Sequence, residues 1–210
     1  REIAHLSGRA ATRVLAALEP FLNHPSPPDT ETRKRLLAVL NGVVGDHLAA
    51  SGSPLALPFT LHDADGRRLD VQVLSPSGTA VVFVHGLCLS DRDWGRTTEE
   101  RTGLVEAVSA AVDGTAVLAR YNTGRSIWEN GRALAEQLDA WAASPTGPSR
   151  LVLVTHSMGG LVVRSAVRHA RNAAARWPDL VTDTVYLGTP HQGSPLERTG
   201  TWIQNQLRRS

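Results

Sequence analysis

A serine between an apolar run and a glycine pair is the residue of this chain best suited to nucleophilic chemistry. Residues 151–160 read LVLVTHSMGG, which predicts a buried strand, a sharp turn with Ser157 at its apex, and a helix. Such a turn lifts Oγ clear of the sheet, and the following helix directs free N–H groups and its positive dipole end at the same point. Gly159 and Gly160 let the helix pass close to the strand, and Thr155 stands where the G-x-S-x-G pattern has its first glycine. The pattern indicates acyl transfer; a serine that only caps a helix is the alternative.

A second apolar run, AVVFV at residues 80–84, ends in His85 and Gly86. A strand that ends in His-Gly upstream of a nucleophile is a suitable place for an oxyanion hole. Its donors must be rigid backbone N–H groups, and the loss of one costs roughly 10²–10³ in rate. We expect the N–H groups of Leu87 and Met158 to be these donors. The alternative is a simple turn at the end of a strand.

These motifs together resemble the α/β-hydrolase superfamily, in particular its bacterial lipase and esterase branch. FVHGL at 83–87 is similar to the family's His-Gly element, THSMGG at 155–160 to its nucleophile elbow, and LGTPHQGSP at 187–195 to its sixth-strand segment. RYNTG at 120–124 fits the loop after the fourth strand. The resemblance covers residues 55–210. It implies a carboxylic ester hydrolase that acts through an acyl-enzyme on an acyl chain of moderate to large size, with no metal or organic cofactor.

A serine nucleophile also needs a general base, usually histidine, and an acid that orients it. In the family order both follow the serine. His156 is adjacent to the serine but should be held elsewhere by the turn, and His169 falls three helical turns further on and should point away. The resemblance implies a structural role for His191, although it stays a candidate base. Asp183 opens a strand at the end remote from the chemistry, and Glu197 lies on the last predicted helix.

Two explanations account for the missing partners. The chain is a piece of a longer protein whose Asp and His lie beyond residue 210, which the absence of an initial Met and the ending inside WIQNQLRRS favour. Alternatively, the fold is catalytically inactive and serves as a binding or assembly protein. We expect the first, with little or no activity from this chain alone. A thioesterase or amidase is a further enzyme alternative.

The elements that must position these residues alternate between strand and helix. Apolar runs and helical periodicity predict strands at 80–84, 115–119, 151–155 and 182–187, and helices near 97–112, 126–142, 158–173 and 196–208. This alternation indicates an α/β fold with a mostly parallel sheet covered on both faces. Ser126 and Glu129 form a capping box, and Trp128 and Trp141 are expected in the core or the cleft wall. The strand at 182–187 is expected as a bare sheet edge, which favours a homo-oligomer, pairing with a chain that completes the sheet, or poor solubility.

The residues before the parallel sheet have a different pattern. Apolar residues alternate on both sides of a turn at 63–66 and predict an antiparallel hairpin; they are Leu55, Leu57, Phe59 and Leu61, then Leu69, Val71 and Val73. Residues 1–50 predict two amphipathic helices with stripes at Val14, Leu18, Phe21 and Leu22, and at Leu36, Leu40, Val44 and Leu48. We expect a domain at 1–50 that packs on the core, caps the cleft or contacts a second subunit, and an α/β-hydrolase core, apparently truncated, at 55–210.

Composition agrees with a globular enzyme of 210 residues, of which 41% are hydrophobic and 20% charged. No apolar run approaches the length that spans a bilayer, so no transmembrane segment is expected. The net charge of +2 and the absence of a nucleic-acid-binding module argue against a nucleic-acid partner and leave a small-molecule or lipid ester. The single cysteine, Cys88, is expected to be a packing residue and is compatible with a reducing compartment. No signal peptide is visible, so we expect a cytoplasmic protein, with a removed leader before Arg1 as the alternative.

Overall fold

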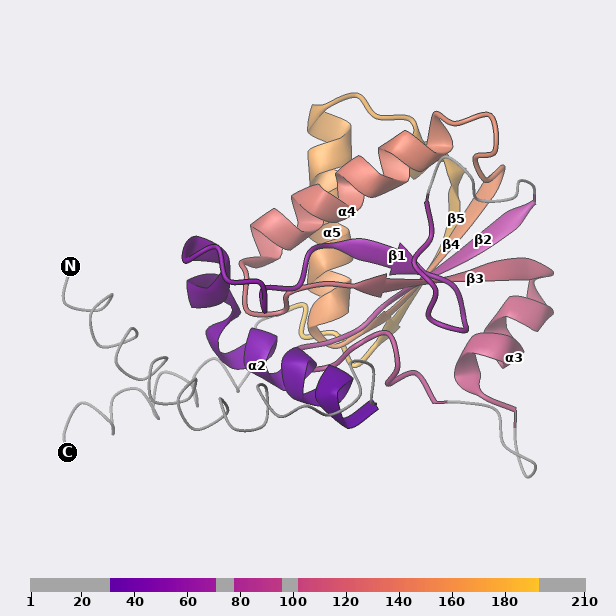
Figure 1. The fold of residues 1–210 in the computed structure, drawn as a ribbon. Helices are drawn as coiled ribbons and strands as arrows, with labels where there is room; N and C mark the ends of the chain where they lie inside the picture. Colours follow the sequence, from indigo (N-terminus) through magenta and orange to yellow (C-terminus); the bar gives the residue numbers. More distant parts are fainter. Residues whose placement is uncertain (1–30, 71–77, 96–101, 193–210) are drawn as a thin grey trace, which may run out of the picture.

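The computed structural model describes residues 31–70, 78–95 and 102–192 (Figure 1). The first predicted amphipathic helix, the end of the predicted hairpin at Val71 and Val73, and the predicted helix at 196–208 lie outside the described residues.

Five strands form one sheet in the order β1-β3-β2-β4-β5. Their bounds are β1 Thr60–His62, β2 Thr79–Val84, β3 Gly114–Arg120, β4 Arg150–His156 and β5 Val181–Leu187. All neighbours are parallel except β1 and β3, which are antiparallel. The four predicted parallel strands are confirmed to within one residue at each end, because each is a continuous apolar run of strand length.

Helices cover both faces of this sheet (Figure 1). The helix α3 (Leu104–Ala111) lies on one face, and α4 (Ile127–Ala142) and α5 (Met158–Asn172) pack together on the other. The predicted capping box at α4 is present, since Ser126 Oγ accepts from the Glu129 N–H at 3.1 Å and a Glu129 carboxylate oxygen accepts from the Ser126 N–H at 3.3 Å. The prediction of a helix from residue 97 is wrong at residues 102 and 103, because Gly103 has extended backbone angles and α3 begins after it.

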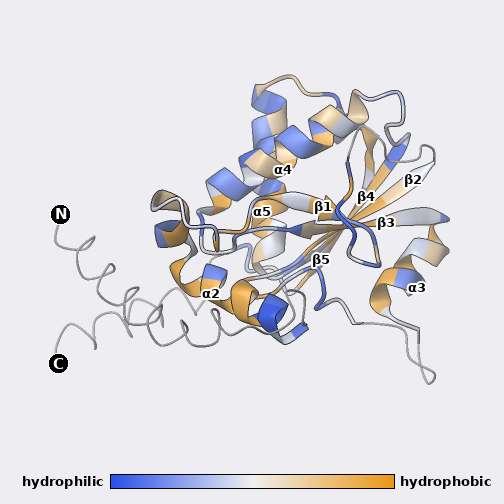
Figure 2. Ribbon diagram, in the orientation of Figure 1, coloured by the Kyte–Doolittle hydropathy of each residue, from blue (hydrophilic) through white to orange (hydrophobic). Residues whose placement is uncertain are grey.

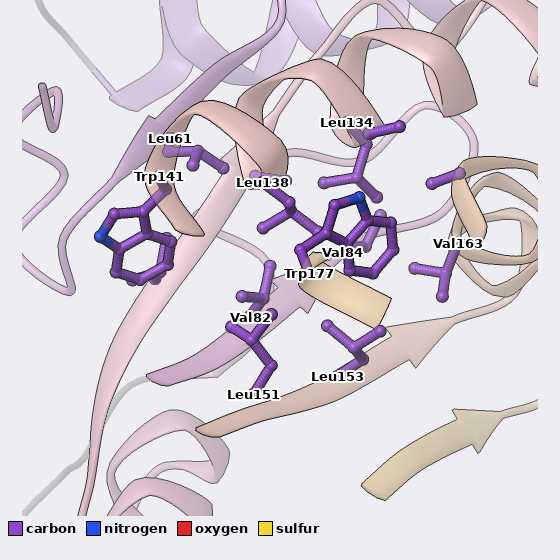
Figure 3. Packing of buried hydrophobic residues seen from close by; sticks show 14 of the residues in the cluster. Leu61, Val82, Val84, Leu134, Leu138, Trp141, Leu151, Leu153, Val163 and Trp177 are labelled. Carbon is purple, nitrogen blue, oxygen red and sulfur yellow. The ribbon is translucent and has the colours of Figure 1, made fainter. Parts of the chain in front are cut away.

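The main core lies between the sheet and the pair α4 and α5 (Figure 3). Leu134, Leu138 and Trp141 of α4 pack there against β2 and β4, and Trp177 of the short 3₁₀ helix Trp177–Leu180 is fully buried. Figure 2 shows orange, apolar residues along the central part of the sheet and blue, polar residues on α4 and α5. The prediction for Trp141 is confirmed. Trp128 differs: it is 51% exposed and packs on the ring of His169, because it lies on the outer side of the first turn of α4.

The predicted hairpin is only partly present. Its turn forms, with the Leu69 N–H donating to the Leu61 carbonyl at 2.8 Å, but the first arm is a strand only over β1 and pairs with β3. The reason is a competing partner. The side chain of Asn41 donates to the Leu55 carbonyl and accepts from the Leu57 N–H, both at 2.9 Å, so these backbone groups bond to a helix instead of a strand.

That helix is α2 (Glu31–Ala50), the second of the two predicted amphipathic helices. It buries Leu40, Val44 and Leu48 of the predicted stripe and is kinked at Val44, where φ is −131° and ψ is 19°. Within the described ranges, no helix combines the length and apolar character needed to cross a membrane.

Candidate active site

Ser157 lies at the junction of β4 and α5 in a conformation that L-residues rarely adopt. Its φ is 51° and its ψ is −123°, a backbone strain that costs on the order of 1–3 kcal/mol. The Ser157 N–H donates to the Leu187 carbonyl at 2.8 Å, which ties the turn to the end of β5. The serine side chain forms no capping hydrogen bond to α5. A helix cap therefore does not explain this residue.

The glycines after Ser157 allow the strained turn to form. A Cβ at Gly159 would overlap the carbonyl oxygen of Val84, and one at Gly160 would overlap the Thr189 side chain. Because that oxygen belongs to the backbone at the end of β2, any larger residue at Gly159 would push α5 away from β2. Thr155 is accommodated because its Oγ1 donates to the Val185 carbonyl at 3.0 Å.

The His-Gly segment lies directly against this turn. A Cβ at Gly86 would be 3.1 Å from Ser157 Cβ and 3.2 Å from His156 Nδ1. This proximity follows from the sheet, because β2 and β4 are parallel neighbours and Val84 is in register with Thr155. The residue after Gly86 is Leu87, which is 49% exposed, and the residue after Ser157 is Met158, the first of α5. Both predicted oxyanion donors thus belong to segments that meet at the serine.

Residues 120–123, at the end of β3, hold the segment that follows β2. The Tyr121 hydroxyl donates to the His85 carbonyl at 2.5 Å, and Thr123 Oγ1 accepts from the Cys88 N–H at 3.1 Å. The two hydrogen bonds therefore hold the chain on either side of Gly86 and Leu87. Cys88 itself has a φ of 59°, so the fixed segment is also tightly bent.

An ion pair fixes the far end of the same segment. Arg120 donates from Nε to Asp91 Oδ1 at 2.6 Å and from Nη2 to Oδ2 at 2.8 Å, a bidentate geometry. Asp91 is only 2% exposed. Burial acts to raise the pKa of its carboxyl, but the hydrogen bonds and charge of Arg120 outweigh it, so the pKa lies below its ordinary value. The carboxylate is therefore ionised at neutral pH and holds the guanidinium.

The helix α2 packs against the 120–123 loop. Asn122 Nδ2 donates to the Gly45 carbonyl at 2.8 Å, and a Cβ at Gly124 would overlap the Asn41 carbonyl oxygen. A Cβ at Gly42 would overlap Cys88 Sγ, so α2 also contacts the segment after the His-Gly pair. The Cys88 thiol is part-buried, and this desolvation raises its pKa. These contacts agree with a packing role for Cys88.

His85 is buried in the middle of these contacts. Its ring stacks on Tyr121 with centroids 4.4 Å apart, and its Nδ1 lies 3.0 Å from the Gly86 carbonyl, so Nδ1 carries the proton. Burial lowers the pKa of His85 to about 4. Its Nε2 is buried with no hydrogen-bond partner among the described residues. The imidazole is therefore neutral and packs against the ring of Tyr121.

The other two histidines near α5 contact aromatic rings. The ring of His156 meets Trp94 edge-on, with centroids 6.4 Å apart. The ring of His169 lies tilted against that of Trp128, with centroids 3.8 Å apart, and its Nε2 lies 3.1 Å from the Trp128 carbonyl oxygen. Twelve residues separate His169 from Ser157, which is about 18 Å along a helix. Neither histidine forms a hydrogen bond with Ser157.

His191 and Asp183 also have other partners. His191 Nδ1 accepts from Arg164 Nη1 at 3.1 Å, and its ring packs edge-on against Tyr186. Asp183 accepts from Arg150 Nη2 at 3.0 Å near the amino ends of β4 and β5, at the opposite end of the strands from the serine. Glu197 lies outside the described residues. In the described part of the chain, no side chains form a group of three or more that could hold a metal ion.

The supporting role of residues 120–123 is absent from the sequence-based prediction. The signal was a run of four polar or aromatic residues, RYNT, directly after an apolar strand. Polar side chains that follow a buried strand lie at the carboxyl edge of the sheet, where the other loops of the site also lie.

Comparison with known proteins gives one family and several structures. Residues 75–210 match the family model of the PGAP1-like alpha/beta domain. The Bacillus licheniformis lipase BlEst2 in its propeptide form is 27% identical over 66% of this chain and 27% of that chain, with a TM-score of 0.45. Its mature form is 26% identical over 65% and 49% of the two chains, with a TM-score of 0.44.

Brefeldin A esterase, described as a bacterial homologue of human hormone-sensitive lipase, is 16% identical over 81% of this chain and 54% of that chain, with a TM-score of 0.30. The chain therefore spans 27% to 54% of the length of these solved proteins.

Proposed function

This chain belongs to the PGAP1-like alpha/beta domain family of the α/β-hydrolase superfamily, and on that premise we propose that it is a serine hydrolase of carboxylic esters. The observation that carries the proposal is the strained backbone of Ser157 directly beside Gly86. The side chain of Ser157 makes no capping hydrogen bond, so its hydroxyl does not account for the strained backbone. The similarity to proteins described as a lipase and an esterase agrees with an ester substrate.

In the proposed reaction Ser157 Oγ attacks the acyl carbonyl carbon and transfers its proton to a histidine base. The carbonyl oxygen becomes an oxyanion, which the N–H groups of Leu87 and Met158 stabilise. The C–O bond to the alcohol then breaks, and the histidine returns the proton to the departing alkoxide. Water, deprotonated by the same histidine, hydrolyses the acyl-enzyme and regenerates the serine.

The base and its acid are proposed to come from residues beyond 210. Within the described ranges, no histidine forms a hydrogen bond with Ser157, and His169 and His191 bond instead to the Trp128 carbonyl and to Arg164. His191 remains the alternative base inside this chain, and it would have to leave Arg164 to act. The competing proposal is a catalytically inactive binding or assembly protein, which agrees with the lack of a histidine hydrogen-bonded to Ser157 among the described residues. A thioester or amide substrate would use the same serine and donors.

A fluorophosphonate probe tests the proposal, because it phosphonylates activated serines. The full-length protein should be labelled at Ser157, and Ser157→Ala should lose both the label and the hydrolysis of p-nitrophenyl esters. Ser149→Ala is the matched control: this hydroxyl donates to the Gly78 carbonyl at the amino end of β4 and should leave labelling unchanged. Full-length protein that is folded yet neither labels nor hydrolyses esters contradicts the enzyme proposal.

The 210-residue polypeptide alone should show only residual turnover. An oxyanion hole without a complete triad retains an acceleration of roughly 10³–10⁴ over water, far below a working triad. A steady-state assay with p-nitrophenyl butyrate measures this directly. Activity equal to that of the full-length protein, lost in His191→Ala, would identify His191 as the base.

A further inference from the structure

An open groove of about 300 Å³ lies between α5 and β5. Its lining comes from these two elements alone and consists of Arg164, Val167, Arg168, Arg171, Asn172 and Tyr186. The first of these residues is about two helical turns along α5 from Ser157, and the last residue of α5 in the groove is about four turns away. The groove is therefore a surface feature separate from the proposed active site.

Three exposed arginines follow one another along this groove. Arg164, Arg168 and Arg171 are spaced by four and then three residues, which places them on one face of α5; we call them the arginine row. The row is about 10 Å long at the rise of an α-helix. Val167, in the middle of the row, and Tyr186, which is 40% exposed, add apolar surface to the groove.

The charge of the arginine row is not balanced within the described part of the chain. The helix α5 contains no Asp or Glu, and among the described residues none of the three guanidinium groups forms an ion pair. The neighbouring helix α4 differs, because Arg125 pairs with Glu129 at 2.6 Å. On the same helix Arg132 pairs with Glu136 at 3.7 Å. The three positive charges of the row exceed the net charge of the whole chain, which is +2.

The stability of α5 does not account for this row. The helix dipole favours a cation in the last turn, which explains Arg171 only, because the effect falls off within one turn. Like charges one turn apart destabilise a helix. Arg164 donates to His191 Nδ1 at 3.1 Å, but an imidazole that accepts a hydrogen bond supplies no negative charge. The row therefore suits an anionic group that another molecule brings to it.

The length of the row indicates what kind of anion fits. A guanidinium group forms paired hydrogen bonds with a carboxylate or a phosphate. A single phosphate is too small to contact all three arginines along about 10 Å, whereas a helix with acidic residues at the same intervals of three and four places one carboxylate at each. Apolar residues of that helix would contact Val167 and Tyr186, as in other complexes where an amphipathic helix lies in a groove.

We propose that the groove between α5 and β5 is a docking surface for an acidic amphipathic helix of a partner protein, whose Asp or Glu side chains pair with the arginine row. The strand β5 is the edge of the described sheet (Figure 1), so the helix can approach from that side. The surface does not include Ser157, and the proposal goes beyond the proposed function and stands without it.

The test is fluorescence polarisation on the full-length protein with a fluorescein-labelled, alanine-rich helical peptide. The peptide carries Glu at alternating intervals of four and three residues, so its acids match the row in either direction. We expect saturable binding that added salt weakens and that is about tenfold or more tighter than for the same peptide with Gln in place of Glu. Phosphate, an oligonucleotide and phosphatidylserine vesicles serve as competitors.

Variants of the row show whether the peptide binds there. Arg164→Gln, Arg168→Gln and Arg171→Gln should each weaken binding about threefold, the size expected for an exposed ion pair. Arg168→Glu should weaken it about tenfold or more, because it replaces an attraction by a repulsion. Arg132→Gln on α4 is the matched control and should keep the wild-type Kd. The variants change exposed side chains, and circular dichroism verifies that they fold.

Several results would overturn the proposal. They are the absence of saturable binding, equal binding of the Glu and Gln peptides, and an unchanged Kd in Arg168→Glu. Binding by the 210-residue polypeptide but not by the full-length protein would show that the protein's own chain covers the groove. Displacement of the peptide by a competitor at a lower concentration than the unlabelled peptide itself would assign the row to another class of anion. Ser157→Ala should bind the peptide as the wild type does, so the outcome is independent of catalysis.

Discussion

At the scale of single residues, His85 couples the fold to pH. The folded protein keeps its imidazole neutral down to a pKa of about 4, whereas the unfolded chain takes up the proton near 6.5. Between these values the unfolded state binds more protons, so the free energy of unfolding rises with pH there and falls as the pH is lowered from 6.5 toward 4. The full effect is on the order of 3 kcal/mol.

The replacement His85→Gln should flatten this pH dependence. Urea unfolding at pH 7 and at pH 4.5 measures it: the wild-type protein should lose stability on acidification, and the variant should lose less. The variant should still lose some stability on acidification, because burial and the charge of Arg120 also lower the pKa of His62. His47→Gln, at a partly exposed position on α2, should keep the wild-type difference. If wild type and His85→Gln lose equal stability between pH 7 and pH 4.5, His85 is not the source of the pH dependence.

At the scale of elements, the loop at 120–123 links the end of β3 to the segment that carries the proposed oxyanion donor Leu87. Tyr121 and Thr123 fix the backbone on either side of Leu87, and Asn122 joins the same loop to α2. Rigid donors are effective because they need no reorganisation when charge develops. The loop residues act through the segment they hold, which makes them positioning residues.

Replacing Thr123 by Val removes the acceptor of the Cys88 N–H and should loosen this segment. A hydrogen bond of this kind contributes about 1 kcal/mol, so we expect kcat to fall roughly fivefold to tenfold with little change in KM. Thr123→Ser keeps Oγ and should restore kcat. Thr115→Val, at an exposed position on β3, is the control. A rise in KM with kcat intact would argue against positioning.

The sequence predicts these elements unevenly, for physical reasons. The turn at Ser157 and the strands before it could be predicted because apolar runs and glycines act locally. That residues 55–59 do not form a strand could not be predicted, because Asn41, from another element, bonds to the backbone of Leu55 and Leu57. The hydrogen bonds of Tyr121 and Thr123 join residues 35 or 36 positions apart, and no local pattern specifies which loops meet.

At the scale of the whole molecule, the described sheet ends in β5, an edge strand unlike its parallel neighbours. Five of the six residues of β2 are buried, as are the five central residues of β4, whereas β5 has none in that class. Val185 and Tyr186 are 41% and 40% exposed. An apolar edge with free backbone groups is a template for pairing with another chain.

We therefore expect the 210-residue polypeptide to self-associate through β5. Sedimentation velocity over a range of concentrations should show oligomers that Val185→Lys shifts toward monomer, because an edge lysine opposes strand pairing. The control is Val43→Lys on α2, where the valine is 57% exposed. A monomeric wild-type polypeptide at all concentrations would count against pairing through this strand.

The backbone of Ser157 has a consequence for how the chain was selected. Its dihedral angles suit glycine far better than any residue with a Cβ, so a glycine there would relieve the strain and fold more readily. The chain instead carries serine, the less stable residue for these angles, directly after the inner strand β4. Selection for stability alone would favour glycine at this position, so the proposed function supplies the reason for a serine here.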